Sequence, residues 1–192
     1  MTTNVNLVGV GGQGILLTAD VLARTAAEAG FDVKKSEIHG MSQRGGSVSS
    51  QVRFDENVLS PIIPAGEADI LVAFDEIEAI RAYPSVRPGG KALVDRCCLV
   101  PVTVSSGQAP APEDPSGTLS RLFAGRLVRI DSGKIAAAAG NRRTANMAIA
   151  GALSRLLPFP EEAWLSAMRG RIPAKLLDVN LAAFAAGRAA SV

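Results

Sequence analysis

A short apolar segment, a group of glycines and an amphipathic segment follow one another at the beginning of the chain. Residues 4–10 read Asn-Val-Asn-Leu-Val-Gly-Val, a pattern typical of a buried strand. Gly9-Val-Gly-Gly-Gln-Gly14 then fits Gly-x-Gly-x-x-Gly, and apolar residues recur every three or four positions from Gln13 to Ala29, before Gly30. This order predicts a strand, a tight glycine turn and a helix, the first unit of an α/β fold.

The remaining sequence keeps alternating between strand-like and helix-like segments. We therefore expect a Rossmann-like α/β fold with a mainly parallel sheet flanked by helices. The run at 68–74 is almost continuously apolar, which indicates a central strand, whereas 47–54 is typical of a strand nearer an edge. The complete set of further strands is expected at residues 32–38, 47–54, 68–74, 91–94 and 127–130.

Helix and turn signals complete this outline. Asp75 is placed to cap a helix at 76–82, and Pro88-Gly-Gly90 predicts a turn before the strand at 91–94. The segment 105–118 is rich in Pro, Gly and Ser, which predicts a loop. Beyond Asp131, which is expected to cap the next helix, we predict helices at residues 135–139, 144–157, 161–169 and 174–186.

The length of 192 residues favours one compact domain with a sizeable core. We place a sheet-based domain at residues 1–155 and a C-terminal helical appendix of the same domain at 156–192. The net charge is +2, from 20 basic and 18 acidic residues, so electrostatics predicts neither a nucleic acid nor a membrane as a partner. Residues 1–19 carry no charged side chain, but their Asn, Gln and Gly content is unlike a signal peptide or a membrane span, and we expect a cytoplasmic protein.

The cysteines and the histidine limit the chemistry of the chain. Cys97 and Cys98 are adjacent, and no other thiol is present to ligate zinc or an iron–sulfur cluster. His39 is the only histidine, so we expect no metal site. No Ser/His/Asp or Cys/His arrangement can be assembled, and the sequence therefore assigns no catalytic residue. Structural thiols are the favoured interpretation of the two cysteines.

The glycine turn is the first candidate ligand site. Glycines let a phosphate approach backbone amides at the positive end of a helix dipole. We expect cofactor contacts from Gly9, Gly11, Gly12, Gln13 and Gly14. A tight turn without a ligand is the structural alternative. Glu37, 23 residues after Gly14, stands close to the offset expected of an acidic residue that binds the ribose of NAD, but this window is wide and supports NAD only weakly.

A second glycine-rich segment spans residues 36–47, Ser-Glu-Ile-His-Gly-Met-Ser-Gln-Arg-Gly-Gly-Ser. Consecutive amides at its glycines can form an anion-binding nest, with the Arg as counter-charge. We expect contacts with the substrate or coenzyme A from His39, Ser42, Gln43, Arg44, Gly45 and Gly46. A plain surface loop is the alternative. The connection Gly140–Asn146 carries Arg142 and Arg143 and could face the same crevice, although its spacing favours a simple link between two helices.

Both glycine-rich segments, together with Val52-Arg53, resemble the gamma-type subunit of the 2-oxoacid:ferredoxin oxidoreductases, and in particular the small (beta) subunit type of indolepyruvate:ferredoxin oxidoreductase. The segments at 68–75, 88–90 and 140–146 also fall where that family has such segments, so the resemblance spans roughly residues 4 to 155. The stretch Gly-Met-Ser-Gln-Arg-Gly-Gly is its most specific part.

The resemblance implies a function in a larger enzyme. The family converts a 2-oxoacid and coenzyme A into an acyl-CoA, CO2 and reduced ferredoxin. The resemblance implies that thiamine diphosphate and iron–sulfur clusters belong to a large alpha-type catalytic partner, and that this chain binds neither of them alone. It also implies that coenzyme A is a co-substrate. The chain contains no Gly-Asp-Gly motif for thiamine diphosphate, in agreement with this division. By itself the subunit would then be inactive.

Two other functions remain open at this stage. The chain could be a stand-alone NAD(P)-dependent oxidoreductase, but it has no Tyr-x-x-x-Lys pair, and its single tyrosine, Tyr83, precedes a proline. It could also be a coenzyme A- or nucleotide-binding module without catalysis. Such a module would bind its ligand without a large partner, and it would have no apolar docking surface for one.

Overall fold

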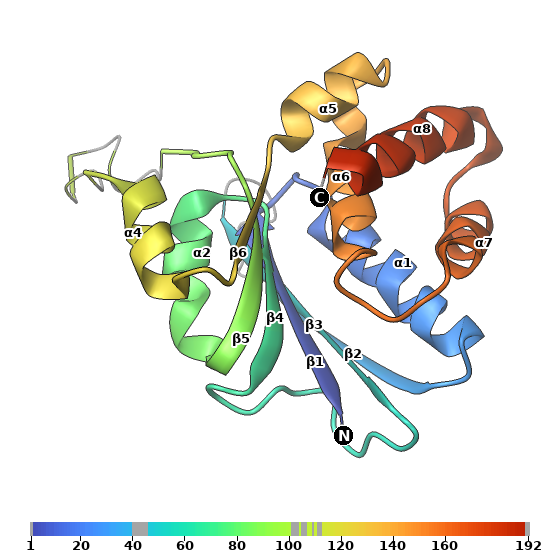
Figure 1. The fold of residues 1–192 in the computed structure, drawn as a ribbon, viewed down its shortest axis with the longest axis horizontal. Coiled ribbons are helices and arrows are strands. Elements are labelled where there is room, and N and C mark those ends of the chain that lie inside the picture. Colours follow the sequence, from blue (N-terminus) through green and yellow to red (C-terminus); the bar gives the residue numbers. More distant parts are fainter. Residues whose placement is uncertain are drawn as a thin grey trace.

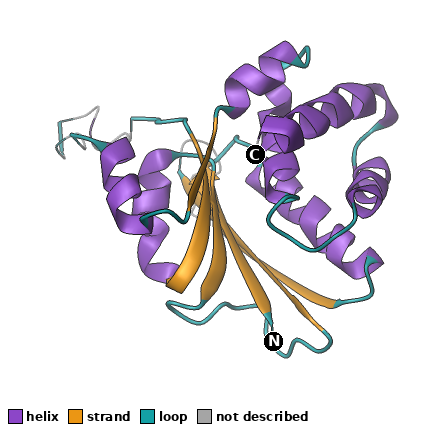
Figure 2. Ribbon diagram, in the orientation of Figure 1, coloured by secondary structure: helices purple, strands orange, loops and turns teal. Residues whose placement is uncertain are grey.

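The computed structural model describes residues 2–39, 46–100, 104, 107–108, 110 and 113–190. The chain forms three layers, with one sheet between two groups of helices (Figures 1 and 2). Helices α2 and α4 cover one face of the sheet, and α1, α6, α7 and α8 cover the other (Figure 1). The predicted Rossmann-like α/β architecture is therefore confirmed.

Within the described ranges the sheet has six strands, in the order β2-β3-β1-β4-β5-β6. In chain order they are β1 Thr3–Val10, β2 Asp32–His39, β3 Ser47–Asp55, β4 Ala68–Ala73, β5 Val86–Asp95 and β6 Leu127–Ile130. Only β3 runs antiparallel to its neighbours, and the other pairs, β1 with β4, β4 with β5 and β5 with β6, are parallel. The sheet is thus mainly parallel, as predicted, with β4 near its centre and β3 second from the edge that β2 forms.

The helices are α1 Ile15–Glu28, α2 Glu76–Ala82, α4 Pro115–Phe123, α5 Ser132–Ala138, α6 Ala145–Leu153, α7 Glu161–Arg171 and α8 Ala174–Ala190. Among the described residues, short 3₁₀ turns span Tyr83–Ser85 and Arg142–Thr144. In the described part of the chain, no helix is both long enough and apolar enough to cross a bilayer.

The predicted loop at 105–118 is wrong for its last residues, because α4 begins at Pro115. The Asp114 carboxylate accepts a hydrogen bond from the backbone N–H of Gly117 (2.8 Å), and Pro115 occupies the first turn. Aspartate at the cap followed by proline is a helix start signal that the Pro-rich composition concealed. Conversely, α6 ends at Leu153, four residues before the predicted end of that helix.

The predicted turn Pro88–Gly90 lies inside β5 as an irregularity. Ala68 pairs with Val86 and Ile70 pairs with Lys91, so two residues of β4 face five of β5. A Cβ on Gly90 would lie 2.9 Å from the carbonyl oxygen of Ala68, closer than real Cβ contacts. The bulge therefore requires a glycine where the two backbones approach.

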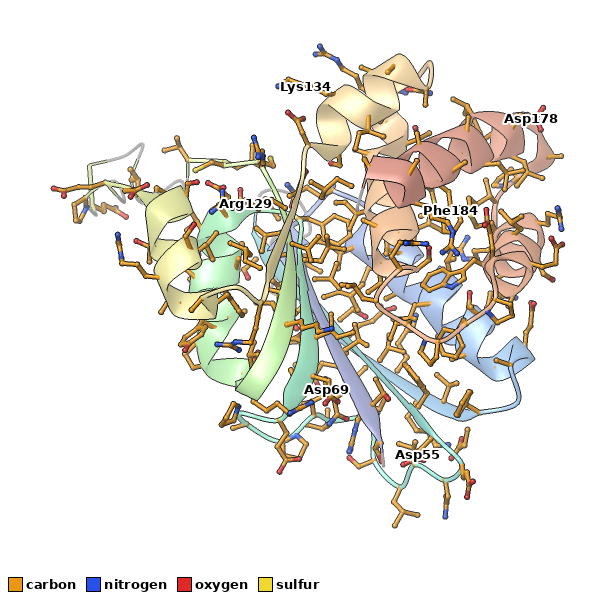
Figure 3. The ribbon with its side chains drawn as sticks, viewed as in Figure 1. Asp55, Asp69, Arg129, Lys134, Asp178 and Phe184 are labelled. Carbon is orange, nitrogen blue, oxygen red and sulfur yellow. The ribbon has the colours of Figure 1, made fainter. Side chains whose placement is uncertain are left out.

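Each face of the sheet has its own core. On the side of α2 and α4, Leu71 and Val94 pack with Phe123, whose ring meets that of Tyr83 edge-on at 5.3 Å between centroids. On the other side, Trp164 of α7 and Phe184 of α8 are fully buried in one cluster with Leu22 of α1. Figure 3 labels Phe184 on α8. The helices beyond residue 155 thus pack into the main core. The domain boundary at 155 stays a prediction.

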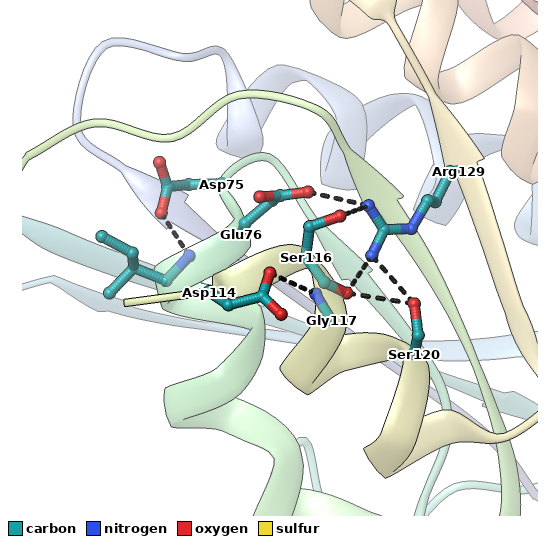
Figure 4. Close-up of polar contacts among 8 residues, drawn as sticks. Asp75, Glu76, Asp114, Ser116, Gly117, Ser120 and Arg129 are labelled. Carbon is teal, nitrogen blue, oxygen red and sulfur yellow. Dashed lines mark hydrogen bonds and ion pairs between the residues drawn. The ribbon is translucent and has the colours of Figure 1, made fainter. Parts of the chain in front are cut away.

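Arg129 of β6 joins the sheet to both helices of its face (Figure 4). Its Nη1 donates to Glu76 Oε1 of α2 (3.0 Å) and to Ser116 Oγ of α4 (2.6 Å). Glu76 follows Asp75, which accepts hydrogen bonds from the amides of Ile77 and Glu78 and caps α2 as predicted. These contacts fix the start of α2 at the carboxyl end of β4.

Candidate functional site

The glycine turn after β1 is closed by the side chain of Gln13. Its Oε1 accepts a hydrogen bond from the backbone N–H of Val10 (2.7 Å), and its Nε2 donates to the carbonyl of Phe74 (2.9 Å). Gly14, with φ +83°, is the N-cap of α1. The amide group of Gln13, predicted to contact a cofactor, therefore joins the turn to the end of β4.

Gly12 is the most accessible member of the turn. It is exposed, has φ +107° and would have no neighbour within 4 Å of a Cβ. In contrast, a Cβ on Gly9 would lie 2.6 Å from Gln13 Oε1, and one on Gly14 would lie 2.7 Å from Asn146 Nδ2. Gly9 and Gly14 are thus required by packing, and Gly12 leaves its backbone open to a ligand.

The second glycine-rich segment reaches the same place. The backbone N–H of Gly11 donates to the carbonyl of Gly46 (2.8 Å), and Ser47 Oγ donates to Glu78 Oε2 of α2 (2.6 Å). His39 is the last residue of β2, where it pairs with Val48. Ser42, Gln43, Arg44 and Gly45, predicted to contact the substrate or coenzyme A, lie outside the described residues.

The position of β2 weakens the case for NAD. In a dinucleotide-binding fold the acidic residue follows the strand beside β1. Here β3 lies between β1 and β2, so the end of β2 is one strand further from the glycine turn. Glu37 itself is exposed and accepts a hydrogen bond from Lys35 Nζ (2.7 Å).

A cavity of about 460 Å³ lies beside the glycine turn. The end of β5 contributes Asp95, Arg96 and Cys97, and the 3₁₀ turn before α6 contributes Arg142 and Arg143. Gly12 and Gln13 complete it on the side of the turn. Parallel strands place their carboxyl ends at one edge of a sheet, which is where ligands bind in open α/β folds.

The carboxylates of this cavity are already bound. Asp95 accepts hydrogen bonds from the backbone N–H of Ser132 (2.8 Å) and from Ser132 Oγ (2.6 Å). Burial nevertheless raises the pKa of Asp95 above its ordinary value. Asp131 accepts from the backbone N–H of Lys134 (3.1 Å) and pairs with its Nζ (2.9 Å), and the hydrogen bonding to Lys134 lowers the pKa of Asp131. Asp131 thus caps α5, as predicted.

The arginines are in the opposite situation. Arg96, Arg142 and Arg143 are exposed, and among the described residues none forms an ion pair or a hydrogen bond with their guanidinium groups, although the nearby charge of Arg96 helps to lower the pKa of Asp131. The sequence spacing favoured a simple link between helices for Arg142 and Arg143, and that interpretation missed their place at the cavity. The signal was topological, because a chain that leaves β6 at its carboxyl end enters the crevice side of the sheet.

A second cavity of about 360 Å³ adjoins the first. Both are lined by Gly12, Gln13, Arg143 and Asn146. The second has apolar walls from α1, the α7–α8 junction and α8, formed by Leu17, Ile172, Leu176 and Val179. A charged and an apolar compartment therefore meet at Arg143.

Cys97 is a protonated thiol at neutral pH. Burial, with the nearby charges of Asp75 and Asp95, raises the pKa of Cys97 to about 11. Its Sγ lies 3.5 Å from Gln13 Nε2, whereas Cys98 is exposed. Within the described ranges, no three His, Cys, Asp or Glu side chains are grouped to hold a metal ion. Two cysteines also cannot supply the four thiolates of an iron–sulfur cluster.

Known proteins resemble this chain along nearly its whole length. The family model described as "Pyruvate ferredoxin/flavodoxin oxidoreductase" matches residues 4–190. Indolepyruvate oxidoreductase subunit IorB of Thermococcus kodakarensis is 39% identical over 188 residues, which are 96% of this chain and 93% of that protein. The IorB subunit of Methanothermobacter thermautotrophicus is 38% identical over 191 residues, 97% of this chain and 96% of that protein.

Solved structures share the fold. The gamma subunit of a keto/oxoacid ferredoxin oxidoreductase from Geobacter sulfurreducens aligns with a TM-score of 0.74 at 21% identity, over 97% of this chain and 94% of that one. A 2-oxoglutarate:ferredoxin oxidoreductase from Magnetococcus marinus, with 2-oxoglutarate, coenzyme A and succinyl-CoA bound, aligns with a TM-score of 0.75 at 23% identity. This chain is covered to 99% and the Magnetococcus chain to 31%.

Proposed function

The chain belongs to the pyruvate ferredoxin/flavodoxin oxidoreductase family, and from this premise we infer that it is the small subunit of a 2-oxoacid:ferredoxin oxidoreductase whose substrate is indolepyruvate or another aryl pyruvate. The complete enzyme releases CO2 from the 2-oxoacid, joins the acyl group to coenzyme A and passes two electrons to ferredoxin. The full-length similarity to IorB subunits carries this inference.

The cofactors of the reaction belong to a large alpha-type partner. Two cysteines do not fit an iron–sulfur cluster, and the sequence has no motif for thiamine diphosphate. When bound in the partner, these groups supply the decarboxylation and the electron transfer. The residues of this chain contribute binding, and the isolated subunit has no turnover.

The subunit holds a phosphate-bearing co-substrate, coenzyme A, at the carboxyl edge of its sheet. The hydrogen bond from Gly11 to Gly46 supports this role, because it brings both glycine-rich segments to one place. The open backbone of Gly12 and the adjoining cavity give a ligand access. In this proposal the segment from His39 to Gly46 contacts the substrate or coenzyme A, and the turn from Gly9 to Gly14 supplies backbone amides.

Purification of the tagged chain from its own cells under mild conditions tests the subunit assignment. We expect a large partner in stoichiometric amount, with thiamine diphosphate and iron–sulfur clusters, by mass spectrometry and absorption. A chain that purifies alone would contradict the assignment.

The same complex tests the substrate. We expect coenzyme A-dependent reduction of ferredoxin with indolepyruvate at a higher kcat/KM than with pyruvate, 2-oxoglutarate or 2-oxoisovalerate. Preference for an aliphatic 2-oxoacid would leave the subunit assignment intact and refute the substrate. Reduction of NAD without a partner would instead support the stand-alone oxidoreductase.

A further inference from the structure

Glu78 of α2 is a buried carboxylate, and each of its oxygens accepts a hydrogen bond. Its Oε2 accepts from Ser47 Oγ (2.6 Å), and its Oε1 accepts from Arg81 Nη1 (2.7 Å). Only 7% of the Glu78 side chain is exposed, whereas the Arg81 side chain is 54% exposed. A carboxylate is costly to bury, so its presence in the first turn of α2 calls for a role beyond packing.

We propose that Glu78 is a positioning residue for the second glycine-rich segment, residues 36–47. It fixes Ser47, and with it the adjacent carbonyl of Gly46, against the glycine turn after β1. The inference rests on the proposed function in one respect, because that function makes the segment from His39 to Gly46 a contact of the substrate or of coenzyme A. Glu78 does not touch the ligand and acts through Ser47.

The place of Ser47 in the sheet explains why it needs this anchor. Ser47 is the first residue of β3 and pairs with Val10, the last residue of β1. The ladder between β3 and β2 ends one residue later, where Val48 pairs with His39. Among the described residues, Ser47 is therefore paired on one side only. Val48 is buried in the core under α1, so Ser47, on the opposite face of β3, points to the side of the sheet that α2 covers.

The residues before Ser47 make the anchor important. Gly45 and Gly46 precede it in the sequence, and glycine loses more backbone freedom than any other residue when its conformation is fixed. The carbonyl of Gly46 accepts a hydrogen bond from the backbone N–H of Gly11 (2.8 Å). This bond and the bond from Ser47 to Glu78 hold two consecutive residues, and together they fix the direction in which the segment enters β3.

The anchor acts on binding through the population of the ordered segment. A hydrogen bond to a carboxylate is stronger than one between neutral groups. A segment that is already ordered binds its ligand more tightly without any new contact, because less ordering is needed on binding. Loss of the anchor lowers the binding-competent fraction of the subunits, and the apparent affinity falls in proportion. A saturating ligand selects the ordered conformation, so we expect the KM to rise and kcat to change little.

The chain offers matched controls for both residues of the anchor. Glu76 is also buried in the first turn of α2, but its carboxylate pairs with Arg129 of β6 (3.0 Å). Ser49 lies two residues beyond Ser47 on the same face of β3, and its Oγ donates to Asn6 Oδ1 (3.3 Å). Variants at Glu76 and Ser49 therefore separate a general weakening of α2 or β3 from the loss of the anchor.

Hydrogen exchange of the Gly11 amide, measured by NMR on the full chain without ligand, tests the anchor. In Ser47→Ala and Glu78→Leu this amide should exchange roughly fivefold to tenfold faster, because one of two neighbouring attachments is lost. Ser47→Thr keeps the hydroxyl and should exchange like the wild type. Glu76→Gln and Ser49→Ala should change the rate by less than about twofold. Circular dichroism confirms that each variant is folded.

Steady-state kinetics of the complex with the large partner test the positioning role. In Ser47→Ala and Glu78→Leu the KM for coenzyme A or for the 2-oxoacid should rise roughly fivefold to tenfold, while kcat changes by less than about twofold. Ser47→Thr should keep the wild-type KM values. A fall in kcat with both KM values unchanged would overturn the proposal, as would equal effects of Glu78→Leu and Glu76→Gln. Faster exchange of Gly11 with unchanged KM values would also overturn it, because the bond would then be structural only.

The double variant Ser47→Ala/Glu78→Leu should raise the KM no further than Glu78→Leu alone, because both substitutions remove the same bond. Effects that multiply would show two independent roles and overturn the proposal. Failure of the proposed function is a separate result, seen as a wild-type chain without a large partner or a complex that oxidises no 2-oxoacid. The exchange of Gly11 decides the anchor even then, and a wild-type rate in both single variants would overturn it.

Discussion

The backbone N–H of Gly11 donates a hydrogen bond of 2.8 Å to the carbonyl of Gly46. These residues are thirty-five positions apart in sequence, and their hydrogen bond brings the turn after β1 against the end of the segment before β3. Ser47, the next residue, is held by Glu78 of α2. The two segments most specific to the sequence are therefore connected by a main-chain hydrogen bond, and the second segment is also held to α2 by the partly buried contact of Ser47.

Gln13→Glu should destabilise the fold by about 1–3 kcal/mol at neutral pH. The substitution keeps the acceptor for the N–H of Val10 but replaces the donor to the carbonyl of Phe74 with a second oxygen. A protonated Glu can donate to that carbonyl, so the loss should shrink as the pH falls toward 4. Urea unfolding of both proteins at several pH values measures the difference, and a loss that grows toward low pH would contradict the role of Gln13.

Gly14→Ala should cost more stability than Gly12→Ala. Both glycines have positive φ, where a Cβ costs roughly 1–2 kcal/mol. Only at Gly14 would the added Cβ also be crowded, because it would lie 2.7–2.9 Å from atoms of the buried Asn146 side chain. This overpacking should add about 1–3 kcal/mol to the loss of stability. Thermal and urea unfolding give the comparison. Equal losses would mean that Asn146 moves aside freely.

Local periodicity was sufficient for much of the fold. The apolar run before the glycines and the three-and-four spacing after them are properties of neighbouring residues, and β1 and α1 follow from them. The direction of β3 is not a property of its own sequence. The seven residues between β2 and β3 are too few for a helical crossover, which forces an antiparallel neighbour.

Only those parts of the candidate site that are formed by residues close together in sequence could be predicted. The glycine turn was visible as a motif, but the internal role of the Gln13 side chain depends on Phe74, 61 residues away. Arg142 and Arg143 looked like an ordinary polar connection, because their place at the cavity depends on how α5 and α6 return over the sheet. The position of these two arginines follows from packing between distant segments, and the spacing of residues within the connection between α5 and α6 does not reveal it.

Arg129→Met should destabilise the chain by about 2–3 kcal/mol, since it leaves the Glu76 carboxylate without its cation in a largely buried position. Glu76→Gln in the same background should recover much of the loss, because it removes the unpaired charge. A double-mutant cycle from urea unfolding measures the coupling between the two residues. Strictly additive single losses would show that the ion pair across β6 and α2 (Figure 4) contributes little.

Asp20→Asn should lower stability at pH 7 by about 1 kcal/mol, and this loss should shrink as the pH falls below the ordinary pKa of an aspartate. Burial raises the pKa of Asp20, but hydrogen bonds from Lys35 and Arg171 outweigh it and lower the pKa below its ordinary value. A lowered pKa gives stability above the unfolded-state pKa, and this stability disappears as the pH falls through the folded-state pKa.

The matched control for this prediction is Asp178→Asn. Asp178 is exposed on α8 (Figure 3), and it has no ion-pair partner among the described residues. Its replacement should change stability by less than about 0.5 kcal/mol at pH 7 and at pH 3. If the free energies of unfolding of the wild type and of Asp20→Asn depend on pH in the same way between pH 7 and pH 3, the ion pairs of Asp20 do not stabilise the fold.

Alkylation should distinguish the two adjacent cysteines. With a pKa of about 11, Cys97 has roughly one thiolate in a thousand molecules at pH 8. Its reaction with iodoacetamide should therefore be slow and accelerate about tenfold per pH unit up to that pKa. Cys98 is exposed and should be labelled first. Peptide mass spectrometry of the Cys98→Ser variant isolates the Cys97 profile, with circular dichroism to confirm folding at each pH. A midpoint near 8 would mean that burial and the Asp75 and Asp95 charges do not control this thiol.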